Sequence, residues 1–160
     1  MPETLTYQTT AEADAYVAAH YRTNSKARTT WDALSEEDKG ILLANACESI
    51  EGLPFTGRKA QWQQPFAFPR LPQQYGRPQV VPDKVKAAQV ELALWAMQDA
   101  DGESAKRQEL QAQGVQSFSI GDLSESYGTT GAAASQPAAL LCLKSAALLR
   151  GFLSGGYAVC

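Results

Sequence analysis

The strongest helical pattern in the chain is PDKVKAAQVELALWAMQ, residues 82–98. Proline suits the first turn of a helix, where its missing N–H has no partner to lose. Apolar residues then recur at helical spacing in one stripe, formed by Val85, Ala88, Leu92, Trp95 and Ala96 and widened by Val90, Leu94 and Met97. A stripe this broad predicts a helix that is buried on two sides.

A first helix is expected over Thr9–Arg22. Thr9 and Glu12 have the spacing of a capping box, in which each side chain bonds the backbone N–H of the other residue. Four residues then fall on one apolar side, Ala13, Tyr16, Val17 and His20. The polar stretch Thr23–Thr30 is expected to be a connector, and the indole of Trp31 is expected to pack against the core.

A second helix is expected from Ser35, because three carboxylates follow in a first turn where the helix dipole favours negative charge. Its predicted buried stripe comprises Ile41, Leu42, Ala46, Cys47, Ile50 and Leu53. Gly52 is expected to end this helix, since glycine accepts the left-handed conformation that is common just past a helix end.

The C-terminal half is expected to hold a β-hairpin and a last helix. Residues alternate with a period of two on both sides of Gly121-Asp122, which is typical of a two-residue hairpin turn within 114–128. Pro137–Leu153 should form a central helix, because it is apolar nearly all round, at Leu140, Leu141, Leu143, Leu148, Leu149 and Phe152. The charged stretch Asp99–Gln113 is expected to face solvent.

The loop over residues 54–81 differs from the rest of the chain. Its five prolines exclude a long helix, and its aromatic residues are Phe55, Trp62, Phe66, Phe68 and Tyr75. Its only charges are Arg58, Lys59, Arg70 and Arg77, so it carries +4 in a chain of net charge −3, and the remainder carries −7. A loop this long without secondary structure is uncommon and usually functional.

Composition excludes several classes of protein. The chain has 160 residues, of which 44% are hydrophobic and 19% charged, as in one globular domain. The net charge of −3 argues against a basic coat for nucleic acid. Three cysteines without C-x-x-C spacing indicate a reducing compartment rather than disulfides or zinc. With no secretory signal and no apolar run of about 20 residues, a soluble protein made in the cytoplasm is expected.

The sequence holds no motif that predicts catalysis. His20 has no cysteine or histidine at metal-ligand spacing and is expected to be packed or interfacial. The carboxylates Glu36, Glu37 and Asp38 are explained by the helix dipole. Cys47 and Cys142 lie in apolar stripes and are expected to be inert core thiols. We therefore expect no enzyme activity, metal or cofactor.

Two segments are candidates for binding. In one interpretation, the loop stacks single-stranded bases on aromatic side chains among cations, with Arg58, Lys59, Trp62, Arg70 and Arg77 as contacts. In the other, its aromatic side chains pack onto the helices. The tail after Gly155-Gly156 either docks Tyr157 and Val159 on a partner's sheet edge or is a frayed end.

Several segments, in their order along the chain, resemble the small head–tail connector proteins of phages and prophages. These are TAEADAY (10–16), WDALSEE (31–37), LPFTGRK (53–59), FPR (68–70), VPDKVKAAQVELA (81–93) and LLRGFLSGGY (148–157). The likeness covers nearly the whole chain. Members of this group often carry the label DnaT-like ssDNA-binding protein.

The resemblance implies a mainly α fold, a small four-helix bundle, in a structural virion protein. Such adaptor proteins form a ring of twelve copies beneath the portal, continue the DNA channel and receive the next neck or tail component. They are assembled in the host cytoplasm, and genomic DNA passes through them without sequence-specific binding.

The resemblance also implies roles for individual segments. Residues 1–153 would form the connector domain, and residues 154–160 an arm that docks on the portal, with Phe152, Leu153, Tyr157, Val159 and Cys160 as contacts. Neighbouring subunits or the downstream ring would be contacted by the loop and the hairpin, through Phe55, Trp62, Phe66, Phe68, Arg70, Phe118, Ile120, Leu123 and Tyr127.

Overall fold

Helices dominate the computed structural model of this protein, which describes residues 6–71, 80–98, 117–120, 123–126 and 138–154. The chain divides into two compact units, Met1–Gln98 with Pro137–Cys160, and Asp99–Gln136. The helices of the first unit are α1 (Thr10–His20), α2 (Lys26–Asp32), α3 (Glu36–Glu51), α4 (Asp83–Gln98), α6 (Ala138–Leu141), α7 (Leu143–Leu149) and the 3-10 helix η1 (Arg150–Phe152). A mainly helical fold is confirmed, whereas the four-helix bundle stays a prediction.

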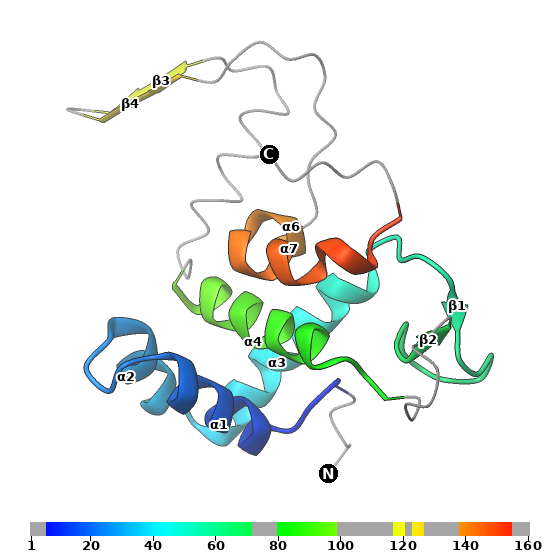
Figure 1. Cartoon of the computed structure of the whole chain (residues 1–160). Helices are drawn as coiled ribbons and strands as arrows, with labels where there is room; N and C mark the ends of the chain where they lie inside the picture. The colour runs from blue at the N-terminus through cyan, green and yellow to red at the C-terminus, as the bar shows by residue number, and fades with distance from the viewer. Residues whose placement is uncertain (1–5, 72–79, 99–116, 121–122, 127–137, 155–160) are drawn as a thin grey trace. The chain divides into compact units, whose positions relative to one another are not determined.

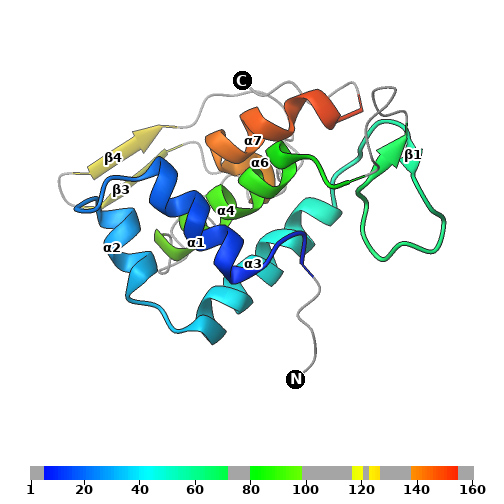
Figure 2. The same cartoon turned by 60° about the horizontal axis from the view of Figure 1, so that its bottom comes forward.

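Helix α4 lies at the centre of the first unit, between α3 and the α6–α7 pair (Figures 1 and 2). Every residue from Ala88 to Leu94 is buried, so the middle of this helix is covered on all sides. The predicted burial on two sides is therefore confirmed. The predicted stripe does not extend over the last turn, because Ala96 is exposed and Trp95 only half-buried.

Helix α1 begins with the predicted capping box. The Thr9 hydroxyl accepts from the Glu12 N–H at 3.2 Å, and the Glu12 carboxylate accepts from the Thr9 N–H at 2.9 Å. The bond from the Thr9 N–H lowers the pKa of Glu12. The Lys86 ammonium, 3.0 Å from the Glu12 carboxylate, lowers this pKa further. The expectation that His20 lies on the apolar side is wrong, because its ring is exposed and stacks on Tyr16 with 4.0 Å between ring centroids.

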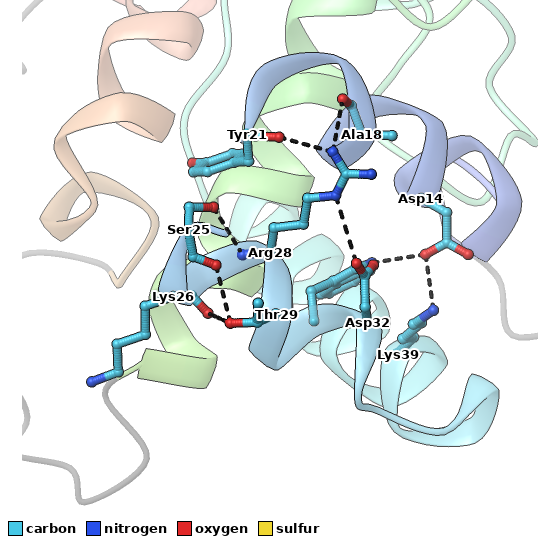
Figure 3. A network of polar contacts seen from close by, with 10 residues as sticks. Asp14, Ala18, Tyr21, Ser25, Lys26, Arg28, Thr29, Asp32 and Lys39 are labelled. Atoms are coloured by element: carbon cyan, nitrogen blue, oxygen red, sulfur yellow. Dashed lines mark hydrogen bonds and ion pairs between the residues drawn. The ribbon is translucent and has the colours of Figure 1, made fainter. Parts of the chain in front are cut away.

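The stretch expected to be a polar connector contains the start of helix α2. Ser25 caps this helix by accepting from the Arg28 N–H at 3.4 Å, and residues from Lys26 onward are helical. Arg28 then ties α2 to the end of α1, since its guanidinium donates to the carbonyl oxygens of Ala18 and Tyr21 at 3.4 and 3.1 Å (Figure 3). The prediction was wrong because the helical pattern of this short polar segment is weak, whereas the bonds that hold the helix reach seven and ten residues back, to the end of α1.

The Trp31 indole is fully buried, as predicted. Its N–H donates to the Asp14 carboxylate at 2.7 Å, and the same carboxylate oxygen pairs with Lys39 at 3.0 Å (Figure 3). Lys39 is itself 6% exposed, and burial alone would lower its pKa. Asp14 and Glu36 reverse this effect and raise the pKa. One carboxylate of α1 therefore joins α2 and α3.

Helix α3 begins at the predicted cap, with the Ser35 hydroxyl accepting from the Asp38 N–H at 3.1 Å. Its buried face differs from the prediction, because Leu43 is buried and Ile41 is 51% exposed. Two residues correspond to about 200° around a helix, so these side chains cannot share a face. Gly52 follows the helix with φ −72° and ψ −6°, so the predicted left-handed conformation is wrong.

The expected continuous helix over Pro137–Leu153 is broken. Cys142 has ψ 104°, an extended value that separates α6 from α7. The break interrupts the helical repeat, so the apolar residues before and after it are not all buried as they would be in one central helix. Leu140 and Leu149 are buried, whereas Leu143, directly after the break, is 70% exposed.

Glu91 of α4 is a buried carboxylate that joins three helices. It accepts from the hydroxyls of Tyr16 and Tyr21 at 2.8 and 2.5 Å and pairs with Lys144 of α7 at 3.6 Å. Burial, followed by these bonds to Glu91, raises the pKa of both tyrosines. The helical core thus contains a satisfied polar cluster that the hydrophobic pattern does not predict.

The second unit contains the expected hairpin strands, β3 (Ser117–Ile120) and β4 (Leu123–Ser126). They pair antiparallel, from Ser117 with Ser126 to Ile120 with Leu123. Asp99–Gln113, the turn at 121–122 and Tyr127 lie outside the described residues. Within the described residues, no helix is long and apolar enough to cross a bilayer.

Candidate assembly surface at the aromatic loop

Glu51, in the last turn of α3, holds the aromatic loop to the helices. Its two carboxylate oxygens each accept from the Ala67 N–H at 2.9 Å, and the Tyr7 hydroxyl donates to the same carboxylate. Tyr7 is 6% exposed, and burial together with Glu51 raises its pKa. One side chain therefore fastens both the N-terminal segment and the middle of the loop.

The aromatic side chains of the loop pack into a cluster inside the first unit. Phe68 is 3% exposed, and its ring meets those of Phe55 and Phe152 edge-on, with centroids 4.7 and 5.5 Å apart. The ring centroids of Phe66 and Tyr7 are 5.3 Å apart. For Phe55, Phe66 and Phe68, the structure therefore agrees with the interpretation that the aromatic residues pack onto the helices.

Arg70 is used inside the loop. Its guanidinium donates to the carbonyl oxygens of Thr56, Gly57, Ala67 and Phe55 at 2.8, 2.7, 3.3 and 3.4 Å. These bonds engage most of the five N–H groups that an arginine side chain offers. The predicted role of Arg70 as an external contact stays a prediction, but few of its donors are left for a partner.

The loop has secondary structure of its own, contrary to the expectation. Strand β1 (Arg58–Lys59) pairs antiparallel with β2 (Arg70–Leu71) at the C-terminal end of α3 (Figure 1). Gly57, just before β1, has φ 76°, which favours glycine. The Gln64 amide group closes the turn by donating to the carbonyl oxygens of Phe66 and Pro69 at 2.8 and 2.9 Å.

Three of the predicted contact residues form an exposed tip on this small hairpin. The tip comprises Arg58, Lys59 and Trp62, and the Trp62 side chain is 85% exposed. The Lys59 ammonium donates to the Gln64 carbonyl oxygen at 3.3 Å, while the Arg58 guanidinium makes no hydrogen bond or ion pair to any described residue. The tip therefore presents an aromatic face and two cations on a bonded scaffold.

The closing segment of the first unit lies against the start of the loop. Leu153 pairs with Phe55 in an antiparallel bridge, the Thr56 N–H donates to the Phe152 carbonyl at 2.8 Å, and the Ser154 N–H donates to the Pro54 carbonyl at 3.0 Å. Phe152 and Leu153, predicted to dock on the portal, are half-buried within the subunit. Their external role stays a prediction.

The remaining predicted residues fall elsewhere. Tyr127, Tyr157, Val159, Cys160 and Arg77 lie outside the described residues. Phe118, Ile120 and Leu123 lie on the β3–β4 hairpin of the second unit. Among the described residues, the structure thus brings together only the predicted contacts of the loop and the two predicted portal contacts Phe152 and Leu153.

Two residues that organise this surface were missed in the sequence. Glu51 was a polar residue at a helix end, and Gln64 one of several glutamines in the loop. The role of Glu51 could have been inferred, because its carboxylate lies beside a buried stripe and directly before an aromatic loop. Nothing in the local pattern distinguishes Gln64 from Gln61 or Gln63.

The described residues contain no cluster of histidine, cysteine or carboxylate side chains that could hold a metal ion. Cys47 and Cys142 are free and buried, as expected. Burial raises the pKa of the Cys47 thiol to about 11. This thiol is therefore protonated near neutral pH and is a poor nucleophile.

Comparison with known proteins agrees with part of the sequence analysis. No curated protein and no solved structure matches the chain. A family described as "Putative DnaT-like ssDNA binding protein" matches residues 1–160. This is the label carried by the group that the sequence resembles, and the match does not name a head–tail connector. Because the match spans the whole chain, the protein belongs to this DnaT-like family.

Proposed function

We propose that this protein is a structural connector of a phage virion, which forms a ring on the portal and joins it to the neck or tail. The observation that carries the proposal is the bridge between Leu153 and Phe55, with its flanking hydrogen bonds. This contact fixes the point from which residues 155–160 continue. A terminal arm with a fixed base loses less entropy on docking than a free one.

The loop tip adds a second contact surface in the same unit. Trp62 is among the most exposed large apolar side chains of the described residues, and Arg58 and Lys59 lie on the same small hairpin. Tryptophan and arginine are the residues most enriched at the energetic centres of protein interfaces. A subunit of such a ring contacts both the portal and other components. The arm would supply the first contact and the tip the second.

Deleting Tyr157–Cys160 tests the proposed arm. The deletion lies beyond the last described hydrogen bond, at Ser154, so we expect an unchanged unfolding midpoint. Joining to portal-containing particles should be lost, because the apolar contacts of the arm are removed. Tail joining is measured by sedimentation and electron microscopy of particles assembled with the truncated chain.

A matched variant separates arm length from arm chemistry. Tyr157→Ser with Val159→Ser keeps the chain length and removes two apolar side chains, and it should fail to join in the same way. Normal tail joining by both altered chains would rule out the arm. A truncated chain that unfolds at a lower temperature would show that the tail stabilises the subunit instead.

A second function, binding of single-stranded DNA, is favoured by the exposed tip and by the family description. Trp62 offers a face on which a base can stack, and two cations lie close in sequence. The buried rings of the aromatic cluster are not available for stacking in this conformation. The candidate site is therefore limited to Arg58, Lys59 and Trp62 among the described residues.

Fluorescence anisotropy with a labelled oligothymidine at low salt tests this second function. Trp62→Ala should weaken binding by about 1–3 kcal/mol, the usual contribution of one stacked base. Arg58→Ala with Lys59→Ala should reduce the salt dependence. Arg22→Ala with Lys26→Ala, which removes two exposed cations elsewhere, is the control. No binding by the unaltered chain at low salt would eliminate this function.

A further inference from the structure

Two exposed patches of the first unit complement each other in charge and polarity. The first is the loop tip, Arg58, Lys59 and Trp62. The second, which we name the α3 patch, comprises Glu37, Asp38, Ile41 and Asn45, all exposed. On a helix, residues three and four apart are surface neighbours. Ile41 therefore lies between the two carboxylates and Asn45.

The α3 patch has an unpartnered apolar centre. Ile41 is 51% exposed, although its neighbours Leu42 and Leu43 turn towards the core. The Glu37 carboxylate makes no hydrogen bond or ion pair to any described residue, whereas the Asp38 carboxylate accepts from the Ser35 hydroxyl at 2.7 Å. An apolar side chain with a polar rim is the usual composition of a small protein contact.

The two patches lie at opposite ends of α3. The α3 patch occupies the first turns of this helix, and the tip belongs to the loop that follows its last residue. From Asp38 to Gly52 the helix rises about 20 Å. Figure 2 shows the start of α3 at the end of the helix that lies away from β1. The tip therefore cannot cover the α3 patch of its own subunit.

We propose that the loop tip of one copy docks on the α3 patch of the next copy. Trp62 would cover Ile41, and Arg58 and Lys59 would face Glu37 and Asp38. This inference rests on the proposed ring and names its subunit interface. A contact between two different patches of the same chain is head-to-tail, and repeated contacts of this kind close into a ring when the rotation permits.

A second copy is favoured over other occupants by the distribution of charge. The tip carries the two cations Arg58 and Lys59, and the α3 patch carries the two carboxylates Glu37 and Asp38. A nucleic acid would engage the cations of the tip and be repelled by the carboxylates of the α3 patch. Another copy of the chain offers a match to both patches at once, because its tip is cationic and its α3 patch is anionic.

Photo-crosslinking of the full chain tests this interface. A benzophenone side chain introduced at Gln63, an exposed neighbour of Trp62, should yield covalent dimers and higher ladders at millimolar protein and low salt. Mass spectrometry should map the adducts to residues 36–45 of a second copy. Adducts at any other surface, or none, would overturn the proposal.

Charge reversal provides an independent test by sedimentation equilibrium. Arg58→Glu with Lys59→Glu, and separately Glu37→Lys with Asp38→Lys, should each weaken self-association at least tenfold. Mixing the two double variants should restore it, because each tip then meets a patch of opposite charge on the other variant. Restored association also shows that both variants are folded. If the mixture associates no better than either variant alone, the proposed pairing is wrong.

The same variants in particles separate this inference from the proposed function. If the unaltered chain joins the portal but the adducts of the chain with benzophenone at position 63 map to another surface, the interface is wrong and the connector function stands. If the unaltered chain does not join the portal at all, the proposed function fails, whatever the crosslinks in solution show.

Discussion

Replacing Trp31 with alanine is expected to reduce the free energy of unfolding by about 3–5 kcal/mol, the usual cost of truncating a buried aromatic side chain. The indole is fully buried, and its N–H is bonded to Asp14 at 2.7 Å. The change removes this bond and opens a cavity between α2 and the core. Since a domain has only about 5–15 kcal/mol in total, urea unfolding should show a large fall in midpoint.

Two comparisons sharpen the Trp31 prediction. Trp31→Phe keeps most of the buried volume but loses the indole N–H, so it should cost clearly less than the alanine variant. Trp62→Ala removes the same residue type from a position that is 85% exposed, and its effect should stay within about 0.5 kcal/mol. Equal midpoints for the alanine variants at positions 31 and 62 would contradict the buried position of Trp31.

Replacing Glu51 with alanine is expected to cost about 3 kcal/mol or more and to loosen the aromatic loop. Hydrogen bonds to a charged group contribute about 1.5–3 kcal/mol each, and buried donors left unpaired add a penalty. The Ala67 N–H and the buried Tyr7 hydroxyl both lose their acceptor. Amide hydrogen exchange at Ala67 should accelerate, and urea unfolding should occur at lower denaturant.

Glu48→Ala is the matched control for Glu51. Glu48 is on the same helix, is exposed, and its carboxylate makes no hydrogen bond or ion pair to any described residue. Its replacement should leave both readouts nearly unchanged, with an effect within about 0.5 kcal/mol. If the variants at positions 48 and 51 behave alike, Glu51 does not fasten the loop.

The helix starts that the sequence predicts correctly depend on contacts within a few residues. Thr9 with Glu12, and Ser35 with Asp38, bond each other across one helical turn, so their spacing alone identifies the cap. The start of α2 was missed because its capping serine lies in a short polar segment, where the helix is supported by Arg28 bonds to α1.

The candidate surface was predictable in its residue types but not in their roles. Proline, aromatic and basic residues mark residues 54–81 as a binding segment. The same residues serve two purposes in the structure: Phe68 is buried and Arg70 bonds the loop's own carbonyl oxygens, while Trp62 and Arg58 face outward. A sequence pattern does not distinguish a cationic side chain that bonds the carbonyl oxygens of its own loop from one that is exposed to a binding partner.

Local order in the chain was sufficient for the helical class, the caps of α1 and α3, the burial of α4 and the β3–β4 strands, because periodicity and capping act over one or two turns. Packing between distant segments set the rest. The bridge from Leu153 to Phe55 joins residues far apart in the sequence. The break at Cys142 and the burial of Leu43 in place of Ile41 occur in segments that pack against other helices. Such features depend on contacts between segments, and no single segment contains the partners that specify them.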